Sequence, residues 1–172
     1  MDAMQNLLTR TSVKKYKSDP VPKALIEKIV EAGTYAPSGR NAQSPIILAI
    51  SDRQVRDELS RINAKILGAE GADPFYNAPV VLVVLAEKER NTRVYDGSCV
   101  MENLMLAAHA LGLGSCWIHR AKETFELPEG KALLEKLGVK GEYEGVGNCI
   151  VGYADGEFPV KPRKENRVYY VD

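Results

Sequence analysis

The stretch that most constrains the fold is residues 80–86, which read Val-Val-Leu-Val-Val-Leu-Ala. β-Branched residues favour strands, and a strand that is apolar at every position must be covered on both of its faces. We therefore expect a central strand in a sheet with helices on either side. At 172 residues the chain can bury a substantial core but is short for two domains, so we expect one domain spanning residues 1–172.

The remaining apolar patterns predict further helices and strands. Helical spacing is found within residues 25–33, 55–66, 95–111 and 133–137, and shorter apolar runs at 46–50, 115–119 and 149–153 predict strands. Because these elements do not alternate regularly, they favour an α+β fold over a doubly wound sheet. The helix at 95–111 has more small and apolar surface than one core face uses. It either lines a dimer interface or lies at the centre of a monomer.

Composition and charge argue against several classes of function. The 23 basic and 23 acidic side chains balance, which gives no support to a nucleic-acid or anionic-membrane binder. No apolar segment is long enough to span a bilayer and no signal-peptide pattern begins the chain, so we expect a cytoplasmic protein. The three cysteines and two histidines lack the spacing of metal ligands, so we expect reduced thiols and no metal.

Two short cationic groups lie near opposite ends of the chain. If residues 10–16 are extended, Arg10, Ser12 and Lys14 project from one side, because strand side chains alternate. The second group is Lys-Pro-Arg-Lys at residues 161–164. Each could be a solvated basic turn. A fold that brings both together would form a site for a dianion such as a phosphate monoester.

Residues 36–45, Ala-Pro-Ser-Gly-Arg-Asn-Ala-Gln-Ser-Pro, have the composition of a turn. Their short neutral side chains can hydrogen-bond a heterocycle, although an ordinary loop with local hydrogen bonds has the same composition. Residues 68–79 form a second loop, which we interpret as a mobile lid. At its end, Phe75 and Tyr76 either stack on a planar substrate or seal the edge of the core.

Taken together, these residues resemble the FMN-dependent nitroreductases over nearly the whole chain. The resemblance is carried by residues 10–16 (Arg-Thr-Ser-Val-Lys-Lys-Tyr), 36–45, 110–118 (Ala-Leu-Gly-Leu-Gly-Ser-Cys-Trp-Ile) and 161–163, in the order found in the family. It implies a central mixed, mainly antiparallel sheet flanked by helices, in an intertwined homodimer.

The resemblance also implies FMN as cofactor, bound between two subunits. The implied cofactor-binding residues are Arg10, Thr11, Ser12, Lys14, Pro37, Ser38, Gly39, Asn41, Gln43, Cys116, Trp117, Ile118, His119, Lys161 and Arg163. Of these, the FMN phosphate would be held by Arg10, Ser12, Lys161 and Arg163. Lys14 would reach the ribityl or pyrimidine side, residues 117–119 would lie against flavin N5, and residues 37–43 would come from the partner chain.

The implied activity is an oxidoreductase that uses NAD(P)H. In the family, hydride passes to flavin N5 and then to a nitroaromatic, quinone or similar small acceptor in a ping-pong cycle. No side chain is then needed as a nucleophile, and Lys14 gives electrostatic support to the reduced ring. Two alternatives stay open: a flavin-binding protein for sensing, storage or partner interaction, and a reductive dehalogenase or flavin-destroying enzyme on the same fold.

Overall fold

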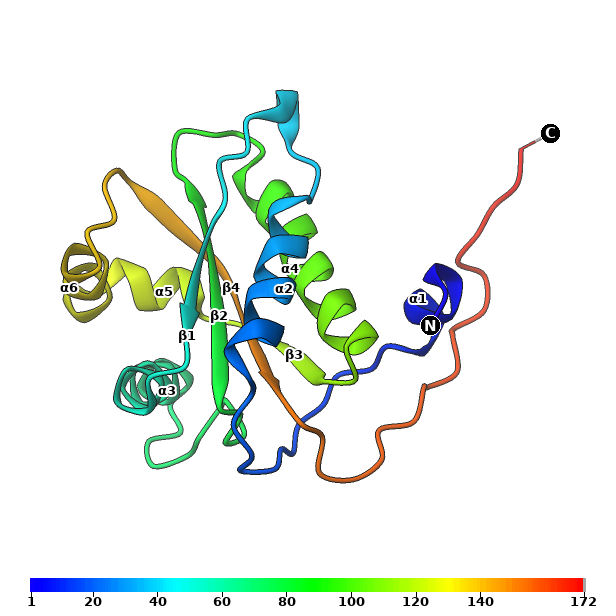
Figure 1. The fold of residues 1–172 in the computed structure, drawn as a ribbon. Coiled ribbons are helices and arrows are strands. Elements are labelled where there is room, and N and C mark those ends of the chain that lie inside the picture. Colours follow the sequence, from blue (N-terminus) through cyan, green and yellow to red (C-terminus); the bar gives the residue numbers. More distant parts are fainter. Residues whose placement is uncertain (172) are drawn as a thin grey trace.

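The computed structural model describes residues 1–171 as an α+β fold (Figure 1). Along the chain the elements are α1 (Ala3–Thr9), α2 (Lys23–Thr34), the single-turn 3-10 helix η1 (Gly39–Asn41), β1 (Ile46–Ile50), α3 (Arg53–Leu67), β2 (Val80–Glu87), α4 (Arg93–Ala110), β3 (Gly114–Ile118), α5 (Ala121–Glu126), α6 (Pro128–Lys136) and β4 (Tyr143–Gly152). None of these helices combines the length and hydropathy needed to span a bilayer.

The four strands form one antiparallel sheet in the order β1-β2-β4-β3. The prediction of a central, fully covered strand is confirmed, because β2 lies between β1 and β4 and its residues 80–86 are all buried. A parallel pairing is present only as the isolated bridge between Ser12 and Ser115, within the described residues. β3 is therefore an edge strand whose outer side is partly covered by the N-terminal segment.

Helices cover both faces of the sheet (Figure 1). On one face, α2 and α4 enclose a core that includes Ile29, Leu82 and Leu104. On the other, α3, α5 and α6 enclose a second core that includes Val83 and Phe125. Successive β2 side chains enter opposite cores, as the pleat of a strand requires. This two-sided burial explains why residues 80–86 have no polar position.

The two ends of the chain lie beside each other at one end of the sheet. Val13 N donates to Ser115 O at 2.9 Å and Lys17 N donates to Tyr153 O at 2.9 Å, so residues 13–17 cross from β3 to the end of β4. Beyond β4, Thr11 Oγ1 donates to Phe158 O at 2.9 Å. The last of these bonds joins residues 147 positions apart.

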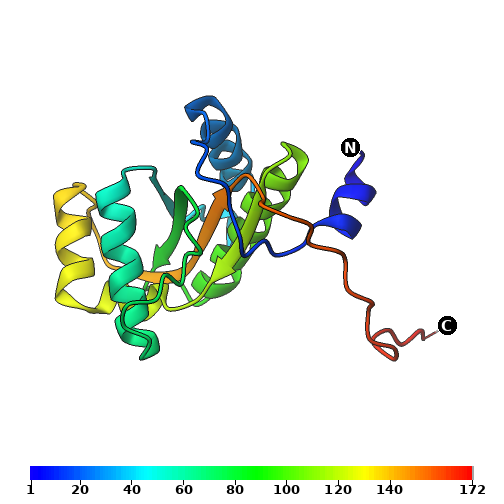
Figure 2. The ribbon, with the colours of Figure 1, turned by 90° about the horizontal axis from the view of Figure 1, so that it is seen from below.

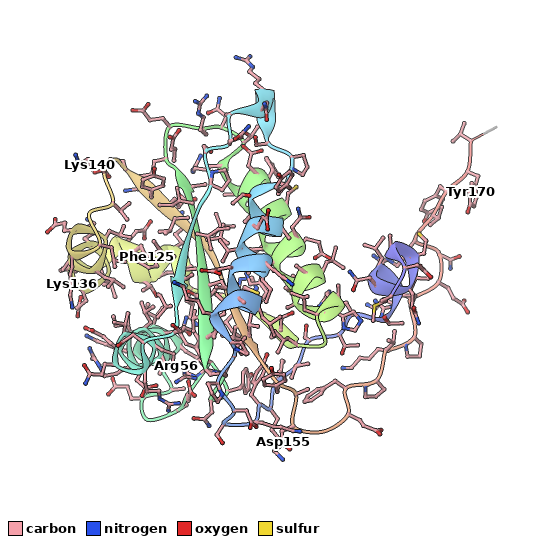
Figure 3. The ribbon with its side chains drawn as sticks, viewed as in Figure 1. Arg56, Phe125, Lys136, Lys140, Asp155 and Tyr170 are labelled. Carbon is pink, nitrogen blue, oxygen red and sulfur yellow. The ribbon has the colours of Figure 1, made fainter. Side chains whose placement is uncertain are left out.

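Both termini then project away from the body of the molecule (Figure 2). Asp2 Oδ1 accepts a hydrogen bond from Gln5 N and caps α1, but no residue of α1 is buried. The apolar side chains left exposed on α1 and the C-terminal segment include Met4, Leu7, Leu8, Val160, Val168, Tyr169, Tyr170 and Val171. Tyr170, labelled in Figure 3, is 86% exposed.

Candidate functional site

A cavity of about 1010 Å³ opens beside β3 where the two ends of the chain meet. Its walls are the N-terminal segment, the end of β3 with the following turn, the C-terminal segment, and part of the loop after α3. Among its lining residues are Arg10, Thr11, Ser12, Lys14, Cys116, Trp117, Ile118, His119, Lys161 and Arg163. The structure thus brings together ten of the fifteen cofactor-site residues expected from the sequence.

The two cationic groups line this cavity together. Arg10 is the most enclosed of them, with a side chain 21% exposed and its Nε 3.9 Å from Glu102 Oε1. Its Nη1 is buried and has no hydrogen-bond partner within residues 1–171. Because an unpaired buried donor is costly, a ligand acceptor at this position would be stabilising. The side chain is therefore suited to an anionic group.

β3 supplies the opposite wall through Cys116 and the residues that follow it. Burial raises the pKa of the Cys116 thiol above its usual value, although nearby Ser12, Lys14 and Arg10 act in the opposite direction. The thiol is consequently protonated at neutral pH and does not act as a nucleophile there. The Trp117 and His119 rings lie 6.2 Å apart between their centroids and give this end of the cavity an aromatic surface.

The two aromatic residues of the loop after α3 have different surroundings. Tyr76 lines the cavity, and the Lys14 Nζ lies 5.9 Å from the centroid of its ring. Phe75 is 1% exposed and belongs to the core between the sheet and α3. The expectation that Phe75 contacts a substrate is therefore corrected, because its ring is enclosed by core side chains. Of the two residues, only Tyr76 can meet a ligand in the cavity.

A buried charge network fixes this loop. Arg56, 2% exposed and labelled in Figure 3, forms an ion pair with Asp73 at 2.6 Å. The Asp73 carboxylate also accepts hydrogen bonds from Phe75 N and Asn77 N, at 3.0 and 2.6 Å, and from the Ser60 hydroxyl. Residues 73–77, which form part of the loop interpreted above as a mobile lid, are therefore anchored to α3. The anchoring places the Tyr76 backbone at a φ of 51°.

The turn at residues 37–43 does not line this cavity. Pro37, Ser38 and Gln43 line a separate cavity of about 350 Å³ at the end of α2. In Figure 1 this turn lies at the opposite end of α2 from the N-terminal segment. α2 has 12 residues, a length of about 18 Å. Gly39 and Asn41 also lie outside the first cavity, so none of the five expected residues of this turn meets the other ten within one chain.

The backbone conformation of this turn is nevertheless fixed by contacts with α4. Arg40, Asn41 and Gln43 have φ values of 55°, 52° and 50°, a left-handed conformation that is uncommon for residues other than glycine. The buried Asp96 of α4 accepts a hydrogen bond from Gly39 N at 2.9 Å, and Thr92 Oγ1 donates to the same carboxylate at 2.8 Å. A backbone strained in this way and held by a buried group is typical of a binding surface.

Sequence reasoning missed Arg120, which lines the cavity immediately after β3. Its φ of 74° is left-handed, and Arg120 Nε donates to Asn63 Oδ1 at 2.9 Å. Neither property has a local sequence signal, because Asn63 is 57 positions away. A basic residue after an apolar strand is a common pattern, so it does not indicate a binding role.

Comparison with protein families gives one match over most of the chain. The sequence model described as "Nitroreductase family" matches residues 7–153. A protein of Methanothermobacter thermautotrophicus, provisionally named NADH dehydrogenase/NAD(P)H nitroreductase, is 30% identical over 142 residues, which cover 75% of this chain and 71% of the relative. The NADPH-flavin oxidoreductase of Vibrio harveyi is 25% identical over 94% of this chain and 70% of its own length.

Solved structures agree with the sequence match. A nitroreductase from Bacteroides fragilis, crystallised with bound FMN, superimposes with a TM-score of 0.91 at 28% identity over 100% of both chains. Iodotyrosine deiodinase, bound to FMN and 3-iodo-L-tyrosine, shares the fold with a TM-score of 0.74 at 22% identity, over 98% of both chains. With the family match over residues 7–153, these similarities establish that the chain belongs to the nitroreductase family.

Proposed function

We propose that this protein is an FMN-dependent oxidoreductase that passes reducing equivalents from NAD(P)H to a nitroaromatic, quinone or similar small acceptor. The observation that carries the proposal is the meeting of Arg10, Lys161 and Arg163 in one cavity, from opposite ends of the chain. The relatives named above support it, because their names include NAD(P)H nitroreductase and NADPH-flavin oxidoreductase.

The residues of the cavity fit FMN. A phosphate dianion would be held by Arg10, Ser12, Lys161 and Arg163, and the buried Nη1 of Arg10 offers a donor that lacks an acceptor in the described residues. The apolar and aromatic side chains of Ile118, Trp117 and Tyr76 suit a planar ring system. At about 1010 Å³, the cavity lies at the upper end of the range for small-molecule sites, so a second planar molecule could share it.

When bound, FMN supplies the redox chemistry by accepting a hydride and passing electrons on to an acceptor. The side chains of this protein would bind the flavin, orient its ring and shield it from water. Lys14 would place a positive charge beside the ring, where it stabilises negative charge that develops on reduction. The Tyr76 ring near the Lys14 ammonium limits where that side chain can move. No charged nucleophile is needed, which agrees with the protonated state of Cys116.

The proposal is tested on purified protein in two measurements. We expect a flavin absorption spectrum that survives extensive dialysis, and release of FMN on denaturation. With the flavinated protein, we expect steady-state NADH or NADPH oxidation that depends on an added nitroaromatic or quinone. Flavinated protein without turnover on any acceptor would favour a sensing or storage role, and turnover confined to halogenated phenols would favour reductive dehalogenation.

We further propose that the active form is a homodimer in which residues 37–43 of one subunit close over the cavity of the other. Two features support this. The turn is separated from its own cavity by the length of α2, and the C-terminal segment carries exposed apolar side chains, with Tyr169 and Tyr170 at 85% and 86% exposure. Burying such side chains against a second chain would stabilise the dimer by about 1.5–3 kcal/mol for each side chain.

Replacing Val168, Tyr169, Tyr170 and Val171 by serine should therefore shift the protein toward monomer. We expect the flavin content per chain to fall about tenfold at micromolar protein, because the turn would no longer reach the partner's cavity. Light scattering and the ratio of flavin to protein absorbance measure both effects. Leu137→Ser is the control, since Leu137 is 52% exposed on the far side of the molecule. A fully flavinated monomer would rule out the shared site.

A further inference from the structure

Arg120 is held in place by buried polar groups of three different elements. Its carbonyl oxygen accepts hydrogen bonds from Thr124 N at 2.9 Å and Thr124 Oγ1 at 2.7 Å. The preceding carbonyl, of His119, accepts from Asn63 Nδ2 at 2.8 Å and Asn148 Nδ2 at 3.3 Å. Asn63, Thr124 and Asn148 are 0%, 2% and 1% exposed. Such groups stabilise the left-handed backbone of Arg120, which costs energy in a residue other than glycine.

The same network orients the guanidinium. Arg120 Nε donates to Asn63 Oδ1 at 2.9 Å, which leaves the two Nη groups for another acceptor. Neither Nη group forms an ion pair or hydrogen bond within residues 1–171, although the residue is half-buried and lines the cavity. Two parallel N–H groups in one plane match the two oxygens of a carboxylate.

We propose that Arg120 is a specificity-determining residue that selects acceptors carrying a carboxylate. This inference rests on the proposed function and names the substrate class of the same cavity. A carboxylate on an aromatic ring would receive both Nη groups of Arg120, while the reducible group of the acceptor lies against the flavin. Because the guanidinium is already oriented, little conformational entropy is lost when the acceptor binds.

Two other phosphate groups of the reaction are less suited to Arg120. The flavin phosphate has Arg10, Lys161 and Arg163 available, and these lie on the terminal segments rather than after β3. The extra phosphate of NADPH is separated from the nicotinamide by two riboses and a diphosphate. A group that distant from the reacting atoms would lie outside a cavity already shared with a flavin ring.

A pair of acceptors of similar size and shape, one charged and one neutral, tests the proposal. We would measure kcat/KM for 4-nitrobenzoate and for neutral 4-nitrobenzamide, at fixed NADH. In Arg120→Gln the ratio of the two values should fall about 10- to 150-fold, as expected when a charge-assisted bidentate contact is lost. Arg120→Lys, which keeps the charge without the fork, should give an intermediate ratio.

A binding measurement gives a readout that does not depend on turnover. Benzoate and benzamide are titrated into the oxidised, flavinated protein while the flavin absorbance is recorded. We expect Arg120→Gln to raise the Kd of benzoate relative to that of benzamide by the same factor. Lys122→Gln is the matched control, because Lys122 lies two positions further on, pairs with Glu144 at 3.7 Å and does not line the cavity. It should change the ratio less than about twofold, since exposed charges act weakly.

The outcomes separate this inference from the proposed function. If wild-type protein reduces both acceptors and Arg120→Gln leaves their ratio unchanged, the selectivity proposal is wrong and the oxidoreductase proposal stands. A change in the ratio of NADPH to NADH use, without a change for the two acceptors, would assign Arg120 to the electron donor and overturn the acceptor proposal. Absence of turnover on every acceptor rejects the enzyme proposal itself, and unchanged benzoate binding in Arg120→Gln then rejects the carboxylate contact as well.

Discussion

Replacing Arg10 by alanine is expected to weaken FMN binding about 10- to 150-fold, the loss that follows from removing one charge-assisted contact of about 1.5–3 kcal/mol. Arg163→Ala should have an effect of similar size, because both residues line the cavity and are proposed to hold the phosphate. Neither side chain belongs to a hydrophobic core, so the unfolding midpoint of the apoprotein should change little. Equilibrium dialysis of apoprotein against FMN gives the Kd directly.

Two neighbouring lysines serve as controls for the loss of charge. Lys15 is next to Lys14 but pairs with Asp155 at 2.8 Å, and Lys164 follows Arg163; neither lines the cavity. Lys15→Ala and Lys164→Ala should each change FMN affinity by less than about threefold, since exposed charges are screened by solvent. If all four variants lose affinity equally, the phosphate assignment is wrong, and FMN binding depends only on the overall positive charge of this region.

Replacing Asp73 by alanine is expected to lower the free energy of unfolding by about 3 kcal/mol, the lower end of the range for breaking a buried ion pair. Arg56 is 2% exposed and would keep only Asp57 Oδ1 and Ala78 O as acceptors. Urea unfolding at pH 7 measures the change. Asp57→Ala is the control, because Asp57 is 47% exposed, its pair with Arg53 lies at the surface, and Arg56 would keep Asp73; the loss should be about 1 kcal/mol. Equal losses in the two variants would contradict the assignment of Asp73 as the main partner of Arg56.

The same pair gives a pH dependence with a definite sign. Burial raises the pKa of Asp73, but hydrogen bonds from Arg56 and Ser60 and the Arg56 charge outweigh it and hold the pKa below the ordinary value of 3.8. The contribution of Asp73 is thus complete above about pH 4 and is lost as the pH falls through the lowered value. The stability difference between wild type and Asp73→Ala should shrink as the pH falls below about 4.

The parts of the fold that follow from residue patterns were predictable. Residues 80–86 predict a central strand because every position is apolar, and the long helix before β3 was expected at 95–111 and is found at Arg93–Ala110. The last strand was expected at 149–153, whereas β4 runs from Tyr143 to Gly152. Glycines in the first half of β4 interrupt the apolar pattern, so that half was not recognised as a strand in the sequence.

The structure explains those glycines by close packing. A Cβ atom at Gly145 would lie 2.3 Å from the Ala121 carbonyl, and one at Gly147 would lie 2.6 Å from Trp117 Nε1. α5 and the side chain of Trp117 therefore lie directly on the strand, and only glycine leaves room for them. Contacts of this kind join residues more than 20 positions apart, so no local pattern indicates them.

The candidate site was predictable to the extent that its residues form unusual local groups. The cationic groups at 10–14 and 161–163 could be recognised along the chain, and their shared cavity is a result of the fold. Arg120 could not be recognised, because what distinguishes it is its φ of 74° and its hydrogen bond to Asn63 on a different helix. Tyr76 and Phe75 could not be told apart for the same reason, since the turn around Asp73 directs one ring outward and the other inward.

The bond between Thr11 and Phe158 has a consequence for how the protein matures in the cell. A ribosome delivers the chain from its N-terminus, so the sheet and both helical layers are synthesised before Lys161 and Arg163 emerge. A chain that stops shortly after β4 would contain every strand and both helical layers, but it would lack Lys161 and Arg163, two of the four proposed phosphate ligands. We therefore expect a premature stop codon shortly after β4 to yield a folded but colourless product.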